Sequence, residues 1–201
     1  RLEQPMHAAQ TRIPKVVALS MLGRHDDAAA CAEQAKREFV DQGDLGAAGR
    51  VSLNLGSLHL RQDAYARAAL HYRDAALLFA RVGDHEHSIM ADIGSADALA
   101  PMGDLDEAER IYARAAMRAR SRSFPVLEAV VEESRALLDL ARGRYREALA
   151  GLEGSRRRYA ALDLPQPLAG AEQQRGDADL ELRLLPEAIG LLAEAAARFR
   201  S

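Results

Sequence analysis

The sequence predicts an all-α protein built from repeated helical hairpins, and three observations lead to this fold class. Of the 201 residues, 48% are hydrophobic and 28% are charged, which is the balance of a folded chain. Aromatic residues make up only 4% and there is no Trp, so the core must form through close contacts over small side chains, which favours helices over sheets. The third observation is an internal repeat with a period of about 40 residues.

The clearest part of the repeat is its second helix. Five segments superpose at this period, and an alanine stands in register in each of them: Ala28, Ala68, Ala108, Ala148 and Ala188. Three residues before this alanine stand His25, Tyr65, Leu105, Tyr145 and Leu185, and four residues after it stand Ala32, Tyr72, Tyr112, Leu152 and Leu192. Offsets of three and four place these side chains on one helix face, which must be buried against another helix.

The first helix of each repeat lies upstream of this segment, in amphipathic stretches at residues 50–60, 89–100, 129–141 and 169–182. Gly23, Gly103 and Gly143 stand between the two helices, where glycine can take the left-handed conformation that ends a helix. Asp104 can then cap the helix that follows. The repeating unit is therefore expected to be helix–turn–helix.

Prolines fall at the boundaries of the expected helices. Pro125, Pro165 and Pro167 precede first helices, and Pro186 suits the first turn of a second helix. Two prolines depart from this rule. We expect Pro14 to shorten the first helix of the first repeat to about residues 14–22, and Pro101 falls near the end of the first helix in the third repeat.

The pattern resembles the tetratricopeptide repeat (TPR). The second repeat matches it at Gly56, Tyr65, Ala68, Tyr72 and Ala75, the third at Ala96, Gly103, Leu105, Ala108, Tyr112 and Ala115, and the fourth at Ala136, Gly143, Tyr145, Ala148 and Leu152. Asp63 and Arg183 replace the turn glycine, and Val16 departs in the first repeat. This longer form of the repeat is similar to repeats of spindle-orientation adaptors, kinesin light chains, bacterial maltose-type transcription activators and the repeat regions attached to CHAT proteases.

This resemblance implies an α-solenoid, a right-handed superhelix of about five hairpins. We expect a single domain over residues 1–201, with repeats at about 9–42, 48–82, 88–122, 128–162 and 168–201. Because the chain starts at Arg1 rather than at Met, we expect it to be a fragment of a longer protein.

The resemblance also implies function, since the first helices of such an array line a concave groove that binds a peptide or a partner protein. The family's groove positions fall on Arg50, Leu53, Asn54, Ser57, Arg61, Met90, Ile93, Asp97, Val130, Glu133, Ser134, Leu137, Gln173, Gln174, Asp177 and Glu181. Asn54 offers both a donor and an acceptor to a peptide main chain, and Arg50 and Arg61 suit a carboxylate partner. The alternative interpretation of all three is an ordinary solvated helix surface.

Two other functions remain open at this stage. The array could be a ligand-sensing module of a bacterial signalling or transcription-control protein, which would need a closed apolar cavity rather than an open polar groove. It could also self-associate through its C-terminal end, where Leu191, Leu192 and Phe199 would be exposed unless another chain covers them.

We do not expect an enzyme, a cofactor or a metal site. Cys31 lies in an alanine-rich helix without a nucleophile motif, and the ligand spacing of His85, Glu86 and His87 places them on different sides of a helix. Residues 43–49 contain three glycines but follow a helix rather than a strand, so a phosphate site is not expected.

Charge and hydropathy argue against nucleic acid and membrane as partners. The formal net charge is −3, and Glu107 and Glu109 are interleaved with the arginine stripe Arg110, Arg114 and Arg118. No apolar run approaches the roughly 18 residues that span a bilayer. With a single cysteine, the chain is expected in the cytoplasm.

Overall fold

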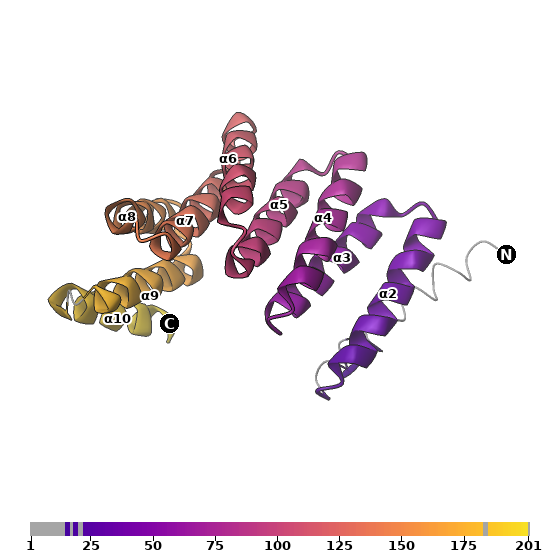
Figure 1. Ribbon diagram of the computed structural model, residues 1–201, viewed down its shortest axis with the longest axis horizontal. Coiled ribbons are helices and arrows are strands. Elements are labelled where there is room, and N and C mark those ends of the chain that lie inside the picture. The colour runs from indigo at the N-terminus through magenta and orange to yellow at the C-terminus, as the bar shows by residue number, and fades with distance from the viewer. Residues whose placement is uncertain (1–14, 17, 20–21, 183–184, 201) are drawn as a thin grey trace. The chain divides into compact units, whose positions relative to one another are not determined.

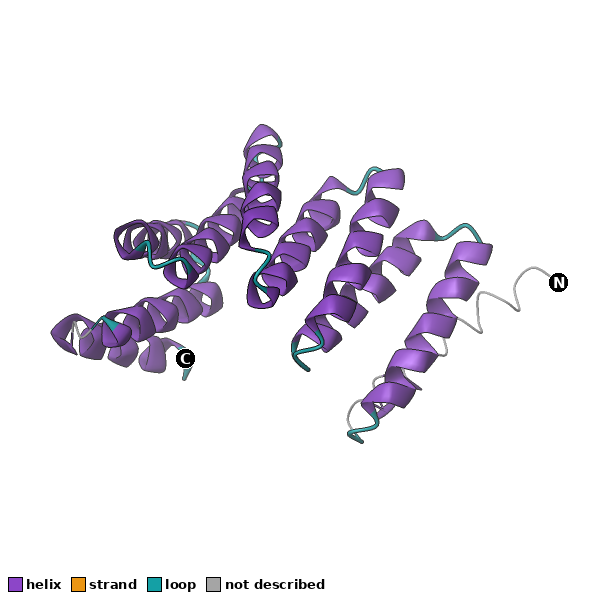
Figure 2. Cartoon of the chain, viewed as in Figure 1, coloured by secondary structure: helices purple, strands orange, loops and turns teal. Residues whose placement is uncertain are grey.

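The computed structural model describes residues 15–200 apart from 17, 20–21 and 183–184. Over these residues the chain forms helices and turns and no strand, as Figure 2 shows, which confirms the all-α prediction. The helices are α2 (His25–Asp41), α3 (Leu45–Leu60), α4 (Tyr65–Arg81), α5 (His85–Leu99), α6 (Leu105–Ser121), α7 (Pro125–Ala141), α8 (Tyr145–Ala161), α9 (Pro165–Glu181) and α10 (Leu185–Arg198). Of the helix predicted at about 14–22, residues 15–16 and 18–19 are helical and Leu22 lies in the turn that follows, while 14, 17 and 20–21 lie outside the described residues.

Successive helices begin at an even spacing along the chain, at His25, Leu45, Tyr65, His85 and so on, and each repeat therefore contains two of them. Every described turn ends its helix with one residue in the left-handed region, at Gly23, Gly43, Asp63, Gly83, Gly103, Ser123, Gly143 and Asp163. The predicted roles of Gly23, Gly103 and Gly143 are therefore confirmed. At the other turns Asp63, Ser123 and Asp163 take the same conformation despite their Cβ atoms, with φ between 53° and 56°.

The first helices begin four or five residues before the amphipathic stretches that predicted them. Capping explains the difference. The side chain of Asp44 accepts a hydrogen bond from the Ala47 N–H (2.9 Å), and Asp84 accepts one from the His87 N–H (3.2 Å). Pro125 and Pro165 are the first residues of α7 and α9 rather than residues before them, because the missing N–H has no partner to lose there.

Pro101 ends α5 as its position suggested. The α-helix stops at Leu99 and a 3-10 turn, Ala100–Met102, contains the proline. A proline cannot donate the backbone hydrogen bond of a continuing α-helix, so the chain tightens and turns at Gly103.

The described residues form two compact units, Arg1–Ala108 and Glu109–Ser201, called unit 1 and unit 2 below. In unit 1 the helices pack in chain order, α2 on α3, α3 on α4 and α4 on α5, and Figure 1 shows them side by side. In unit 2 the same order holds for α7, α8, α9 and α10. The register alanines Ala28, Ala68, Ala108 and Ala148 are all 0% exposed, so the small side chains mark the closest helix contacts, as predicted.

None of the helices in the described residues is long and apolar enough to cross a membrane.

Candidate functional site

The predicted groove residues of α3 form an exposed stripe. Arg50, Asn54 and Arg61 are exposed, while Leu53 and Ser57 are half-buried. Intervals of three, four and seven residues keep these side chains on one helix face. Asn54 makes no hydrogen bond to any described residue, so its amide is available to a partner.

The neighbouring stripe on α5 is only partly exposed. Met90 is 40% exposed and Asp97 is half-buried, but Ile93 is 3% exposed and belongs to the packed interior. The reason is that α5 is buried around much of its circumference, at Ile89, Ala91, Ile93, Gly94, Ala96 and Ala98. Ile93 packs beneath the exposed residues of α5 and therefore cannot contact a partner. The prediction of Ile93 as a groove residue is wrong.

Tyr72 of α4 lies where α3 and α5 come together. Its ring packs against the backbone of both helices, since a Cβ on Gly56 would lie 2.8 Å from the ring and a Cβ on Gly94 would lie 2.6 Å from it. Both distances are too short for a side chain. The two glycines therefore allow the tyrosine to fit between the helices, and Tyr72 is 5% exposed.

The hydroxyl of Tyr72 reaches the predicted groove residues. It shares a hydrogen bond of 3.0 Å with the Oγ of Ser57, which also lies 3.2 Å from the Leu53 carbonyl. Burial raises the pKa of Tyr72, the Ser57 hydrogen bond and Arg61 oppose the rise, and Asp97 adds to it. The Tyr72 hydroxyl thus bonds to Ser57 and lies within the electrostatic influence of Arg61 and Asp97. The sequence had indicated Tyr72 only as part of the repeat core.

Arg50 lies at the other end of the stripe, near the start of α5. The N-cap carboxylate of Asp84 is 2.8 Å from the Nδ1 of His87. Burial opposes ionisation of Asp84, but the hydrogen bonds from His87, the charge of His87 and that of Arg50 lower its pKa below the ordinary value. Arg50 is thus held close to the α5 N-terminus while its side chain stays exposed.

In unit 2 the predicted residues of α7 show the same arrangement of a buried tyrosine beneath a polar stripe. The hydroxyl of Tyr159 donates to the Oε2 of Glu133 (2.8 Å), and Tyr159 is 1% exposed. Burial and the Glu133 carboxylate raise the pKa of Tyr159 well above its ordinary range. Val130 packs against the cluster that contains Tyr159, Ser134 is half-buried, and Leu137 is 38% exposed.

The predicted residues of α9 add acidic and amide groups. Gln173, Asp177 and Glu181 are exposed, while Gln174 is half-buried and its Oε1 is shielded from solvent without a hydrogen-bond partner among the described residues. An amide oxygen in this condition is an acceptor that a bound molecule could use. The unit 1 stripe is therefore basic at Arg50 and Arg61, and the unit 2 stripe is acidic at Glu133, Asp177 and Glu181.

This arrangement can hold another chain by hydrogen bonds and charge. A tyrosine hydroxyl with a partly buried charged pair can orient a main chain or a polar side chain. Within the described residues, no three His, Cys, Asp or Glu side chains are placed to hold a metal ion. Cys31 is 8% exposed in the packed part of α2.

Residues 2–125 match the family model described as soluble NSF attachment protein, SNAP, which is more than half of the chain. The chain belongs to the SNAP family. This family and the solved structures below are TPR-type helical repeats, so the predicted TPR resemblance is confirmed. A comparison with curated protein sequences finds no match.

Several solved structures share the fold of this SNAP-family chain. The apo form of RapI superposes with a TM-score of 0.75 at 9% identity, over 96% of this chain and 54% of that one. A Rap protein complexed with Competence and Sporulation Factor gives a TM-score of 0.78 at 10% identity, over 93% of this chain and 53% of that one. BtubC (BKLC) from P. vanneervenii superposes with a TM-score of 0.68 at 15% identity, over 100% of this chain and 91% of that one. The chain spans about half the length of the two Rap proteins, and these identities establish the fold alone.

Proposed function

We propose that the chain is a protein-interaction scaffold that binds a peptide or a segment of a partner protein on the first helices of its repeats. The primary contact surface is the α3–α5 face, defined as Arg50, Asn54, Ser57, Arg61 and Asp97 with the hydroxyl of Tyr72. The observation that carries the proposal is the hydrogen bond between that hydroxyl and Ser57 on the same helix face as the unpartnered amide of Asn54.

The chemistry of this face suits a main chain with one polar anchor. The Asn54 amide can donate to a carbonyl and accept from an N–H of the same bound segment, which a single hydroxyl cannot do as well. Arg61 and Asp97 offer charges of both signs, so the face discriminates by the order of charges in the segment it binds. One Rap structure of the same fold was captured with Competence and Sporulation Factor, which supports a binding role for such an array.

The predicted residues of α7 and α9 form a second candidate surface, within unit 2. Glu133, Asp177 and Glu181 would take a basic stretch, and the Oε1 of Gln174 would accept a hydrogen bond from it.

Photocrosslinking tests the α3–α5 face directly. Asn54 is replaced by p-benzoylphenylalanine in the host cell, and crosslinked proteins are identified by mass spectrometry. The control carries the same group at Arg73, which is exposed on α4, a second helix. We expect a protein that crosslinks from position 54 and not from position 73.

Affinity then decides whether the named residues bind it. The identified protein is purified and titrated by calorimetry against an Arg50→Ala, Asn54→Ala, Arg61→Ala variant and against a matched Arg67→Ala, Arg73→Ala, Arg81→Ala control on α4. Loss of one charge-assisted contact alone weakens binding by about tenfold, so we expect at least that loss in the first variant and none in the control. Equal affinities in the two variants would overturn the proposal.

The ligand-sensing alternative finds no support in two cavities that the described residues line. It requires an enclosed apolar space, whereas a cavity of about 210 Å³ in unit 2 has charged walls, among them Arg120, Glu132 and Arg135. A hollow of about 390 Å³ beside α2 is lined by Lys15, Arg24 and Asp27 among others. Neither has the apolar lining that a small-molecule site usually has.

Self-association through the C-terminal end stays a prediction. Phe199 is 49% exposed, and Leu191 and Leu192 are half-buried on α10. Replacing Phe199 by Glu would abolish such an association, and sedimentation at several concentrations would show it.

A further inference from the structure

A cavity of about 210 Å³ lies in unit 2 between α6, α7 and α8. Six charged side chains line it: Arg120, Glu128, Glu132, Arg135, Asp139 and Arg158. On α7 the predicted groove residues Val130, Glu133 and Leu137 point about 160° away from Glu128, Val131 and Arg135, as the 3.6-residue period requires. The cavity is therefore on the opposite side of α7 from the proposed partner-binding stripe.

A different set of side chains occupies the same place two repeats earlier. The corresponding positions two repeats earlier belong to the junction of α2, α3 and α4 in unit 1. There Ala48, Leu55 and Leu78 are 0%, 2% and 7% exposed and form part of one apolar cluster. The equivalent positions in unit 2 hold Glu128, Arg135 and Arg158.

The side chains that close the unit 1 junction are also missing from unit 2. In unit 1 the Nζ of Lys36 and the Oγ of Ser52 lie 3.1 Å and 2.7 Å from the Oδ2 of Asp74. The equivalents of Lys36 and Asp74 are Ala116 and Gly154, and His71 is replaced by Gly151. Ala116 in place of Lys36 leaves space on the α6 side, whereas Ala136 and the Glu132 carboxylate pack directly over Gly151 and Gly154. Charged side chains in place of the apolar cluster give the cavity its charged walls.

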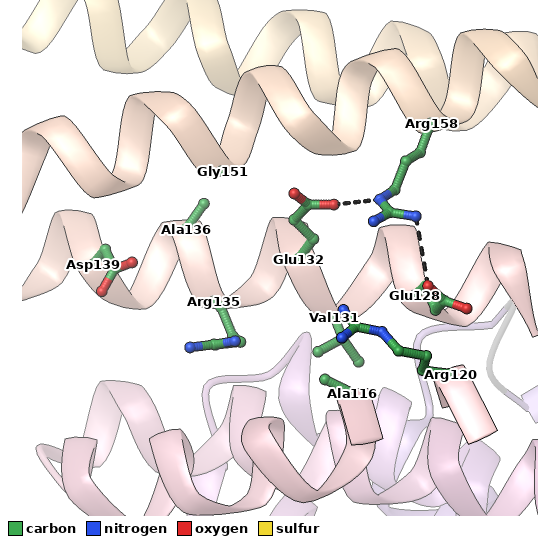
Figure 3. Close-up of a pocket in the computed structure, with 10 residues that line it drawn as sticks. All are labelled: Ala116, Arg120, Glu128, Val131, Glu132, Arg135, Ala136, Asp139, Gly151 and Arg158. Atoms are coloured by element: carbon green, nitrogen blue, oxygen red, sulfur yellow. Dashed lines mark hydrogen bonds and ion pairs between the residues drawn. The ribbon is translucent and has the colours of Figure 1, made fainter. Parts of the chain in front are cut away.

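The charges lining the cavity do not all find partners. The guanidinium of Arg158 lies 2.6 Å from Glu132 and 3.5 Å from Glu128, as the dashed lines in Figure 3 mark, and Asp139 pairs with Arg144 (2.5 Å). Arg120 and Arg135 are exposed and form no ion pair or hydrogen bond with any described residue. Figure 3 shows both of them between the ribbons of α6 and α7. Two guanidinium groups are thus available on the same cavity.

We infer that this cavity binds an acidic side chain, an Asp or Glu, from a segment of a second protein. A guanidinium presents parallel N–H donors that match the two oxygens of a carboxylate. The volume lies below the roughly 300–1,000 Å³ of small-molecule sites but admits one side chain. The carboxylates of Glu128, Glu132 and Asp139 in the walls repel a nucleic acid or another polyanion, so a single negative charge fits best.

Nuclear magnetic resonance of the arginine Nε–Hε groups tests this inference on the intact chain. The probe is the peptide acetyl-Ala-Glu-Ala-amide, compared with acetyl-Ala-Gln-Ala-amide and with inorganic phosphate at the same ionic strength. We expect saturable shifts of the Arg120 and Arg135 signals with the Glu peptide only. Arg120→Gln and Arg135→Gln should each weaken the effect by about tenfold. Arg114→Gln, at an exposed position elsewhere on α6, should leave it unchanged.

A second variant keeps the test independent of charge. Ala116→Leu fills the cavity from α6 without removing an arginine, and it should abolish the Glu-peptide shifts while the helical circular dichroism is retained. Shifts that are equal for the Glu and Gln peptides, or larger for phosphate, would overturn the inference. So would shifts that survive Ala116→Leu. Because none of these residues belongs to the α3–α5 face, the outcome does not depend on the proposed function.

Discussion

The hydroxyl of Tyr72 and the Oγ of Ser57 share a 3.0 Å hydrogen bond across the contact between α4 and α3. This bond joins the interior of unit 1 to its proposed binding face, because the ring is buried while the hydroxyl meets residues of the exposed stripe. We expect Tyr72→Phe to lower the free energy of unfolding by about 0.5–1.5 kcal/mol, the usual net value of one hydrogen bond. Urea unfolding followed by circular dichroism measures the change.

The control for this variant is Tyr145→Phe. Tyr145 is 50% exposed, so removal of its hydroxyl should change stability by no more than about 0.5 kcal/mol. A Tyr72→Phe variant as stable as this control would contradict a structural role for the Ser57 bond.

Gly94 is the position where we expect one added methyl group to lower stability most. A Cβ there would lie 2.6 Å from the ring of Tyr72, and the ring is itself held against Gly56. We expect Gly94→Ala to destabilise unit 1 by about 1–3 kcal/mol through overpacking. Gly170→Ala, inside α9 with no atom within 4 Å of the added Cβ, should instead stabilise by about 0.5–1 kcal/mol because alanine is the better helix former. Thermal unfolding of both variants measures the two changes in stability, which should have opposite signs. Changes of the same sign would contradict the packing of the Tyr72 ring between Gly56 and Gly94.

Ser123 has a left-handed backbone conformation, with φ of 56°. In five other turns the residue with this conformation is a glycine. The Cβ makes this conformation unfavourable by roughly 1–2 kcal/mol. Glycine removes this penalty but loses more conformational entropy on folding, so the net gain in stability is smaller. We expect Ser123→Gly to stabilise the chain by about 0.5–1 kcal/mol in urea unfolding. Gly103→Ala, at φ of 86°, should destabilise it by about 1 kcal/mol, and a stabilising effect there would refute the explanation.

Glu153 makes stability depend on acid pH. Its hydrogen bonds with Arg156 and Arg157 lower its pKa from the ordinary 4.5 to about 2, against the opposing effect of burial. A folded-state pKa below the unfolded one contributes stability that is complete above pH 4.5 and is lost as the pH falls toward 2. Glu153→Gln should therefore be less stable than wild type at neutral pH, with the difference vanishing near pH 2.

The matched control is Glu147→Gln, an exposed glutamate on the same helix that pairs with no described residue. Its difference from wild type should stay near zero across the titration. If Glu153→Gln shows a difference that does not vary with pH, the ion pairs with Arg156 and Arg157 are not its cause.

Local rules were enough to locate the helices and the residues that hold them together. Ala28, Ala68, Ala108 and Ala148 were predicted to be buried from offsets along one helix, and a helix face is a property of adjacent turns. The same reasoning wrongly predicted Ile93 to be an exposed groove residue. Periodicity identifies the side of a helix on which a residue lies, but not how many neighbouring side chains cover that side. It also started the first helices late, since the caps at Asp44 and Asp84 precede the apolar pattern.

Sequence spacing did not predict which arginines form ion pairs. Arg156, Arg157 and Arg158 form one basic run in the sequence, but in the structure Arg156 and Arg157 pair with Glu153 while Arg158 pairs with Glu132 on another helix. Arg120 and Arg135, by contrast, form no ion pair or hydrogen bond with any described residue. The signal that could have found them is the substitution of Val40 and Leu55 by arginine two repeats later.

The sequence by itself determined the all-α class, the period of the repeat, the position of every described turn glycine that it named, and the small residues at the helix contacts. These depend on helix geometry and backbone sterics, which act over a few residues. Tertiary structure alone decided that Tyr72 reaches Ser57 through two glycines, that Tyr159 reaches Glu133, and that α6, α7 and α8 leave a charged cavity. Each of these depends on side chains from different helices meeting in space, and their distances follow from packing rather than from spacing along the chain.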